Sequence, residues 1–193
     1  MDVVYKISYK EDPMHAKQST FRTFLTGVAA GLLAGAVVGQ VDKYTGRMVS
    51  EEQKRREKQV REDSAHKMAG PHFARKILGH ELTEEQVRRS RVAFGVAYGI
   101  MWGLIYAGLR RQFPAVRKAM GLPFAVPFFF GCDGAMAPLM GVSPGIQKIP
   151  WQLNAKELGN HVAWTLTAEA VHRLAPRIGK IASRTATGRE ERL

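Results

Sequence analysis

Ionisable residues follow one face of the last long apolar stretch of the chain. Glu157, His161 and Glu169 are separated by four and eight positions, a spacing that places side chains on the same face of a helix. Asp133 is the single charged residue between Ala119 and Gln147. Charge at membrane depth is costly and is usually paired, neutralised or turned toward water. These four residues are therefore the candidate intramembrane polar site.

Two interpretations of this site stay open at the level of sequence. In the first, Asp133, His161 and Glu169 carry or sense protons, because histidine and carboxylate groups can exchange them. In the second, Asp133 pairs with His161, or Glu169 shares a proton with a neighbour, and the polar row only ties two helices together. The six histidines are scattered and there is one cysteine, Cys132, so we expect no metal, no cofactor and no enzymatic activity.

Four apolar segments must position these residues. A helix needs about 20 mostly apolar residues to cross a hydrocarbon core of about 30 Å. The spans are expected at about 23–41, 92–109, 120–140 and 158–174, of which the first two are uncharged throughout. The third contains Pro123, Pro127 and Pro138, which predict a kinked or broken helix. The fourth is polar and would be stable only with its polar face inside a bundle. The predicted fold class is all-α: an integral membrane bundle of about four transmembrane helices.

The predicted domain organisation is an N-terminal tail at 1–22, one transmembrane domain at 23–174 and a basic tail at 175–193. The alternative for the first apolar segment is a cleaved secretory signal, since Lys17 and Arg22 precede it. The long preceding region carries acidic residues, and the glycine spacing of the segment is typical of a packing helix. We therefore expect it to be retained.

A charged helical loop, 42–91, separates the first two spans. Its two capping boxes begin at Ser50 and Thr83, each followed three positions later by glutamine. The first predicts a salt-bridged helix from Glu51 to about Met68 that stops at Gly70 and Pro71, followed by a short helix at 72–78. The second predicts a long helix that continues directly into the second span.

Small residues recur every fourth position in the first two spans. The glycines are Gly27, Gly31, Gly35 and Gly39 in the first, and Gly95, Gly99 and Gly103 in the second. Small faces allow helices to approach closely in lipid, so these stripes predict packing within the chain, with homo-oligomerisation as the alternative. An aromatic row runs beside the second stripe: Phe94, Tyr98, Trp102 and Tyr106. It favours packing against a helix or lipid over a ligand-binding face.

The charge distribution points to a membrane surface. Lys and Arg number 29 against 17 Asp and Glu, a net charge of +12. Long uncharged runs do not belong in a soluble nucleic-acid-binding protein, so no nucleic-acid partner is expected. The partners we expect are the lipid bilayer, anionic head groups that bind the basic tail, and a second copy or another membrane protein. The positive charge of the short loops favours cytoplasmic termini.

The second half of the chain resembles a known family. Pro138 to Gly141, Ile149 to Trp151, and then Glu157, His161, Trp164 and Glu169 resemble the C-terminal half of the YagU-type bacterial inner-membrane proteins. Ala97 to Gly99, Trp102, Gly103 and Tyr106 look like the second helix of that family. The resemblance covers residues 23–173 and implies a small multi-pass protein of the bacterial cytoplasmic membrane. It implies no activity, and the strongly charged first loop departs from the family.

Two functions follow from these patterns. The first is a membrane protein that handles or senses protons through its buried carboxylates and histidine. The alternative is a non-catalytic assembly protein that docks a partner through its charged helical region at 50–91.

Overall fold

The structure, a computed structural model, describes residues 13–190, with side chains described for residues 20–177. Throughout this part of the chain the regular elements are helices, and no strand occurs. The α-helices are α1 Pro13–Gly46, α2 Glu51–Val60, α3 Ala65–Leu78, α4 Glu84–Gln112, α5 Leu122–Phe129, α6 Ala137–Leu139 and α7 Trp151–Glu190. Short helical turns of other types are η1 Pro114–Gly121, η2 Phe130–Met136 and η3 Ile146–Lys148. The all-α prediction is confirmed.

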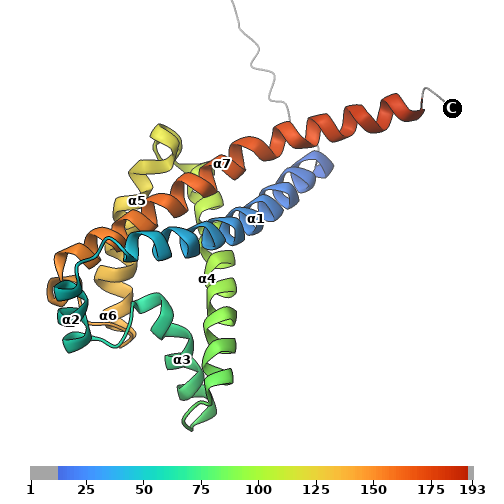
Figure 1. Cartoon of the computed structure of the whole chain (residues 1–193). Coiled ribbons are helices and arrows are strands. Elements are labelled where there is room, and N and C mark those ends of the chain that lie inside the picture. The colour runs from blue at the N-terminus through green and yellow to red at the C-terminus, as the bar shows by residue number, and fades with distance from the viewer. Residues whose placement is uncertain (1–12, 191–193) are drawn as a thin grey trace, which may run out of the picture.

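Three long helices, α1, α4 and α7, form the frame of the molecule. Helices α1 and α7 lie side by side, and α4 crosses them (Figure 1). The α3–α4 turn lies at one end of α4, and the other end reaches Glu169 near the middle of α7 through Arg110. The segment α5–η2–α6 returns along α7 to the loop that precedes Trp151. The start of α1 and the end of α7 therefore lie at the same end of the bundle.

Three helical segments in the described residues are long and apolar enough to cross a membrane by length and composition. They are Thr20–Gly46, Glu84–Gln112 and Pro114–Leu139. They correspond to the first three predicted spans and are compatible with a membrane protein. The fourth predicted span, 158–174, lies inside α7 but does not reach the same hydropathy. Helix α7 also continues through Pro176 to Glu190, so the backbone of the predicted basic tail is helical as far as that residue.

Glycines allow α1 and α4 to cross with their backbones in contact. A methyl group added to Gly31 would overlap the carbonyl oxygen of Gly99 and lie 3.0 Å from the Cα of Gly103. One added to Gly27 would lie 3.1 Å from the carbonyl oxygen of Gly103. Farther along α1, nothing lies within 4 Å of such a methyl group at Gly35 or Gly39. The two helices thus separate on that side of the crossing.

The predicted helix boundaries in the charged loop are wrong in one place. The helix expected at 51–68 ends at Val60, and α3 begins at Ala65 and continues through Gly70 and Pro71 to Leu78. Proline lacks the N–H that would bond the carbonyl of Lys67, four residues earlier. That carbonyl instead accepts a hydrogen bond from Nε of Arg91 on α4, at 3.2 Å. Because α4 supplies the missing donor, the proline is tolerated inside α3.

The two capping boxes begin helices as predicted. Thr83 and Gln86 bond each other's backbone at the start of α4, which continues directly into the second span. At α2 the Ser50 side chain accepts from the backbone of Gln53, but the Ser50 N–H donates to the side chain of Gln152 at 2.8 Å. The charged loop is therefore tied to the start of α7.

The third apolar segment is an interrupted helix, as its prolines indicated. It begins with a turn in which Ala119 and Met120 have positive φ values of 44° and 57°. After α5 the helix widens into the π-helical turn η2, which contains Cys132 and Asp133. Such turns often occur at functional sites because the extra residue changes the direction of side chains.

Candidate functional site

A cavity of about 380 Å³ lies where α1 and α4 separate. Its walls come from α1, α3, α4, the α5–η2–α6 segment and α7. Most of the lining is apolar, including the aromatic side chains Phe94, Tyr98, Phe128 and Trp164. The polar residues that line it include Asp42, His66, Asp133, Glu157, Asn160 and His161. A largely apolar cavity with a few convergent polar groups is typical of a binding site.

Asp133 and His161 lie next to each other at the wall of this cavity and form the Asp133–His161 pair. Nε2 of His161 lies 3.5 Å from Oδ2 of Asp133. The ring is held by Phe128 and Phe129, whose centroids lie 4.5 and 5.7 Å from that of the imidazole. This arrangement matches the pairing of Asp133 with His161 that the sequence left as one of two interpretations.

The hydrogen bond on the other side of the ring assigns the tautomer of His161. Nδ1 lies 2.9 Å from the backbone carbonyl oxygen of Glu157. A carbonyl oxygen only accepts, so Nδ1 must carry a proton and donate it. In the neutral ring Nε2 then has a lone pair that faces the Asp133 carboxylate. One additional proton, on either Nε2 or the carboxyl group, replaces this contact between two acceptors with a favourable interaction.

A second group of polar residues lies one turn nearer the start of α7. Nζ of Lys156 donates to Oδ1 of Asp42 at 2.6 Å and lies 3.4 Å from Oε1 of Glu157. Nδ2 of Asn160 donates to Asp42 at 3.0 Å and to Glu157 at 3.1 Å. Burial alone would lower the pKa of Lys156, but Glu157 and Asp42 outweigh it, so the pKa is raised and the ammonium stays charged. These contacts join the end of α1 to the start of α7.

Two buried acceptors of this group remain without a hydrogen bond. Oδ1 of Asn160 and Oε1 of Glu157 accept none in the described part of the chain, although Glu157 is ion-paired with Lys156. Asn160 is 6% exposed and lines the cavity. Buried polar atoms usually have a partner, so these oxygens indicate a place where a donor can bind.

Glu169, the fourth predicted site residue, belongs to a separate cluster. It is 0% exposed and accepts hydrogen bonds from Tyr106 at 3.0 Å, Nε of Arg110 at 2.6 Å and Nε of Arg173 at 2.7 Å. Tyr106 and Arg110 lie on α4, so their bonds connect α4 to α7, whereas Arg173 lies on α7 itself. Because two guanidinium groups neutralise it, this carboxylate is a structural ion-pair centre. The interpretation in which Glu169 shares a proton with a neighbour does not fit these contacts.

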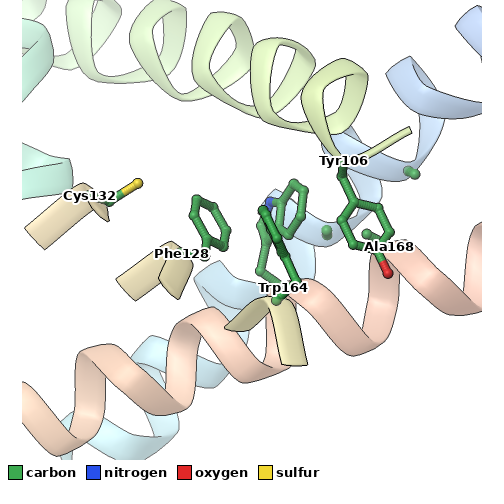
Figure 2. Close-up of a cluster of buried hydrophobic side chains, with 8 residues drawn as sticks. Tyr106, Phe128, Cys132, Trp164 and Ala168 are labelled. Carbon is green, nitrogen blue, oxygen red and sulfur yellow. The ribbon is translucent and has the colours of Figure 1, made fainter. Parts of the chain in front are cut away.

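Aromatic side chains separate the two polar clusters. Phe128 and Trp164 lie between Cys132, on the Asp133 side, and Tyr106, on the Glu169 side (Figure 2). The ring centroids of Phe128 and Trp164 are 5.0 Å apart, and those of Trp164 and Tyr106 are 6.0 Å apart. The structure therefore does not place Asp133 and Glu169 in one proton relay, as the first interpretation required.

The charged loop forms one wall of the cavity. His66 and Lys67 of α3 line it, and Lys67 lies 3.6 Å from Asp42. The loop is anchored by Arg61, which is buried and donates to Oγ of Ser143 at 3.1 Å. Gly70 lies so close to the backbone of Ser90 that an added methyl group would overlap its carbonyl oxygen. Part of the region proposed for partner docking thus packs on the bundle itself.

Some residues of this site were predicted from the sequence, and others were not. Asp133, Glu157 and His161 all line the cavity. The predicted set lacked Asp42, Lys156 and Asn160, although Asp42 directly follows the first apolar run and Asn160 lies three positions after Glu157. Phe94 and Tyr98 of the aromatic row also line the cavity, where packing had been favoured over a ligand face.

Comparison with known proteins assigns no family and no function to this site. The chain matches no protein-family model, no curated protein and no solved structure. Among the described residues, no group of three or more histidine, cysteine, aspartate or glutamate side chains is arranged to hold a metal ion.

Proposed function

We propose that the protein crosses the bacterial cytoplasmic membrane four times and binds and releases a proton at the Asp133–His161 pair. The observation that carries the proposal is the hydrogen bond from His161 Nδ1 to the Glu157 carbonyl oxygen, because it leaves Nε2 to face a carboxylate. The bacterial location rests on the resemblance to YagU-type proteins. Binding of this proton is a response to pH, not a catalytic step.

The surroundings of the pair suit a site that changes charge. The nearby ionisable groups come from several elements: Asp42 and Lys43 of α1, Arg61 after α2, His66 and Lys67 of α3, Tyr98 of α4, Cys132 of η2, and Lys156 and Glu157 of α7. Lys156 is bound between Asp42 and Glu157. Within the described residues, no lysine or arginine forms an ion pair with Asp133, which leaves His161 as its partner.

The packing of α7 supports the proposal of a fourth span. Thr165 and Glu169 are fully buried, and Asn160 and His172 are nearly so, which turns the polar face of the 158–174 segment into the bundle. A polar helix can cross a bilayer when its polar groups are paired inside the protein. If the first three segments each cross the membrane, α7 as a fourth span ends on the side of the membrane where α1 begins.

Labelling of single cysteines tests this topology. In a Cys132→Ala background, cysteines replacing the exposed residues Glu81, Arg111 and Arg177 are treated with a membrane-impermeant maleimide in sealed vesicles. We expect Arg111→Cys and Arg177→Cys to react from the same side, and Glu81→Cys from the other. Labelling of the positions 111 and 177 from opposite sides would contradict a spanning α7.

Fluorescence of Trp164 tests the proton site. Trp164 lines the cavity with His161, and Trp102→Phe and Trp151→Phe leave it as the sole tryptophan. Because an imidazolium quenches indole emission, we expect fluorescence to fall in one step as the pH is lowered between about 8 and 5. His161→Gln should abolish this step and Asp133→Asn should move its midpoint.

The matched control for this measurement is His66→Gln, since His66 also lines the cavity. The step should persist in this variant. If His66→Gln abolishes the step and His161→Gln leaves it intact, the proton binds at His66 and the proposed site is wrong.

A further inference from the structure

The cavity contains more acceptors than the chain can satisfy. Asn160 Oδ1 accepts no hydrogen bond, and Glu157 Oε1 has only its ion pair with Lys156 at 3.4 Å. Among the described residues, the His161 ring is the one polar group paired with the Asp133 carboxylate. Lys43 and Lys67 are the lysines that line the cavity, and Lys67 lies 3.6 Å from Asp42. Lys156 is paired with Asp42 and Glu157, and within the described residues no lysine or arginine forms an ion pair with Asp133. A ligand that pairs with Asp133 must therefore supply a donor and a positive charge.

We propose that the cavity binds an amphipathic organic cation, a primary ammonium on an apolar body. The ammonium lies at Asp133 with Asn160 and Glu157 as further acceptors, and the body packs against Phe94, Tyr98, Phe128 and Trp164. The inference deepens the proposed function, because the ammonium takes the place of the proton at the Asp133–His161 pair.

The walls of the cavity select this class of ligand. A volume of about 380 Å³ is within the range of small-molecule sites and accommodates an aromatic ring with a short alkyl chain. Aromatic faces attract cations as well as apolar groups. Three carboxylates and two lysines, Lys43 and Lys67, line the site. Asp42 and Glu157 are paired with lysines, whereas Asp133 is not, so an anionic group placed at Asp133 is repelled. A neutral ligand leaves the carboxylate of Asp133 without a counter-charge.

Binding must be coupled to the proton. When the pair carries its proton, an arriving ammonium puts a second positive charge beside Asp133, and release of the proton to solvent removes this repulsion. The other charged or titratable groups at or beside the site are Asp42 and Lys43 on α1, His66 and Lys67 on α3, Tyr98 on α4, Cys132 on η2, Lys156 and Glu157 on α7, and Arg61 after α2. Of these, His66 is the one other group that titrates near neutral pH when unperturbed, so His66→Gln accompanies every measurement.

The test is calorimetric titration of the full chain in lipid nanodiscs with 4-phenylbutylamine as the probe. Its matched controls are 4-phenylbutanol, which lacks the charge, and 4-phenylbutyrate, which reverses it. We expect saturable binding of the amine, weaker binding of the alcohol and none of the acid. Repeating the titration in buffers of different ionisation enthalpy measures how many protons are released.

Variants identify the site. Asp133→Asn should weaken amine binding about tenfold or more, the loss expected when a charged hydrogen bond is removed. Glu52→Gln, which removes a carboxylate on the exposed face of α2, should leave binding unchanged. If Asp133→Asn reduces folding, amine binding is measured by the same titration in His161→Gln and Asn160→Leu, which change other residues of the same cavity wall.

The outcomes separate this inference from the proton site. Equal binding of the amine and the alcohol, or equal affinity in wild type and Asp133→Asn, would overturn the cation proposal. Amine binding without proton release would overturn the exchange. The proton site itself is tested by the Trp164 fluorescence titration in the absence of amine. A failure of the proton site is therefore distinguished from a failure of the cation proposal.

Discussion

Replacing Gly31 by alanine is expected to lower the free energy of unfolding by about 3 kcal/mol, the upper part of the range for overpacking. The added methyl group would overlap the carbonyl oxygen of Gly99 and lie 3.0 Å from the Cα of Gly103. Backbone atoms cannot change rotamer to make room, so α1 and α4 must move apart and lose contacts along the crossing. Thermal unfolding in detergent measures the loss.

Gly35→Ala is the matched control for this substitution. Gly35 is the next glycine of the same stripe, but a methyl group there meets nothing within 4 Å. We expect its unfolding temperature to stay near the wild-type value or rise slightly, because alanine favours helix. Equal losses for the two variants would show that α1 and α4 do not cross at Gly31 and Gly99.

Glu169→Gln is expected to cost about 3 kcal/mol of stability, as when one member of a buried ion pair is removed. The carboxylate is fully buried, and its loss leaves Arg110 and Arg173 beside each other without their shared counter-charge. The readout is again thermal unfolding in detergent. The pH-dependent fluorescence of Trp164 should persist, because the aromatic side chains separate this cluster from the Asp133–His161 pair.

The matched control for the ion-pair centre is Glu85→Gln. Glu85 also pairs with two arginines, Arg88 and Arg89, but its side chain is 42% exposed. Exposed pairs contribute about 0 to 1 kcal/mol, so we expect a change of that size. A Glu169→Gln variant as stable as Glu85→Gln would mean that Glu169 is not the buried link between α4 and α7.

Local sequence patterns were sufficient to predict most helices. Long apolar runs and the capping box at Thr83 and Gln86 place α4 correctly, because both signals lie within a few residues of the structure they determine. The continuation of α3 through Gly70 and Pro71 was missed for the opposite reason. Pro71 is a strong local stop signal, but Arg91, twenty residues later, bonds the carbonyl that proline leaves free.

The sequence predicted several residues of the candidate site, but it did not predict which of them lie together. A period of four puts Glu157, His161 and Glu169 on one face of α7. Their partners come from other helices, and sequence spacing cannot show that Arg110 reaches Glu169 or that Asp42 reaches Asn160. The cavity depends on where α1 and α4 separate, which follows from the position of their crossing and not from the glycine spacing alone.

The most direct test of the central claim, a titratable proton at the Asp133–His161 pair, is nitrogen NMR of the protein labelled with ¹⁵N-histidine in nanodiscs. The His161 signals are assigned by their loss in His161→Gln. We predict that Nδ1 stays protonated throughout and that the Nε2 signal shifts between about pH 5 and 8 as the pair gains its proton, with a shifted midpoint in Asp133→Asn. A proton fixed on Nε2 over this range, an unprotonated Nδ1, or a titration unchanged in Asp133→Asn would contradict the account.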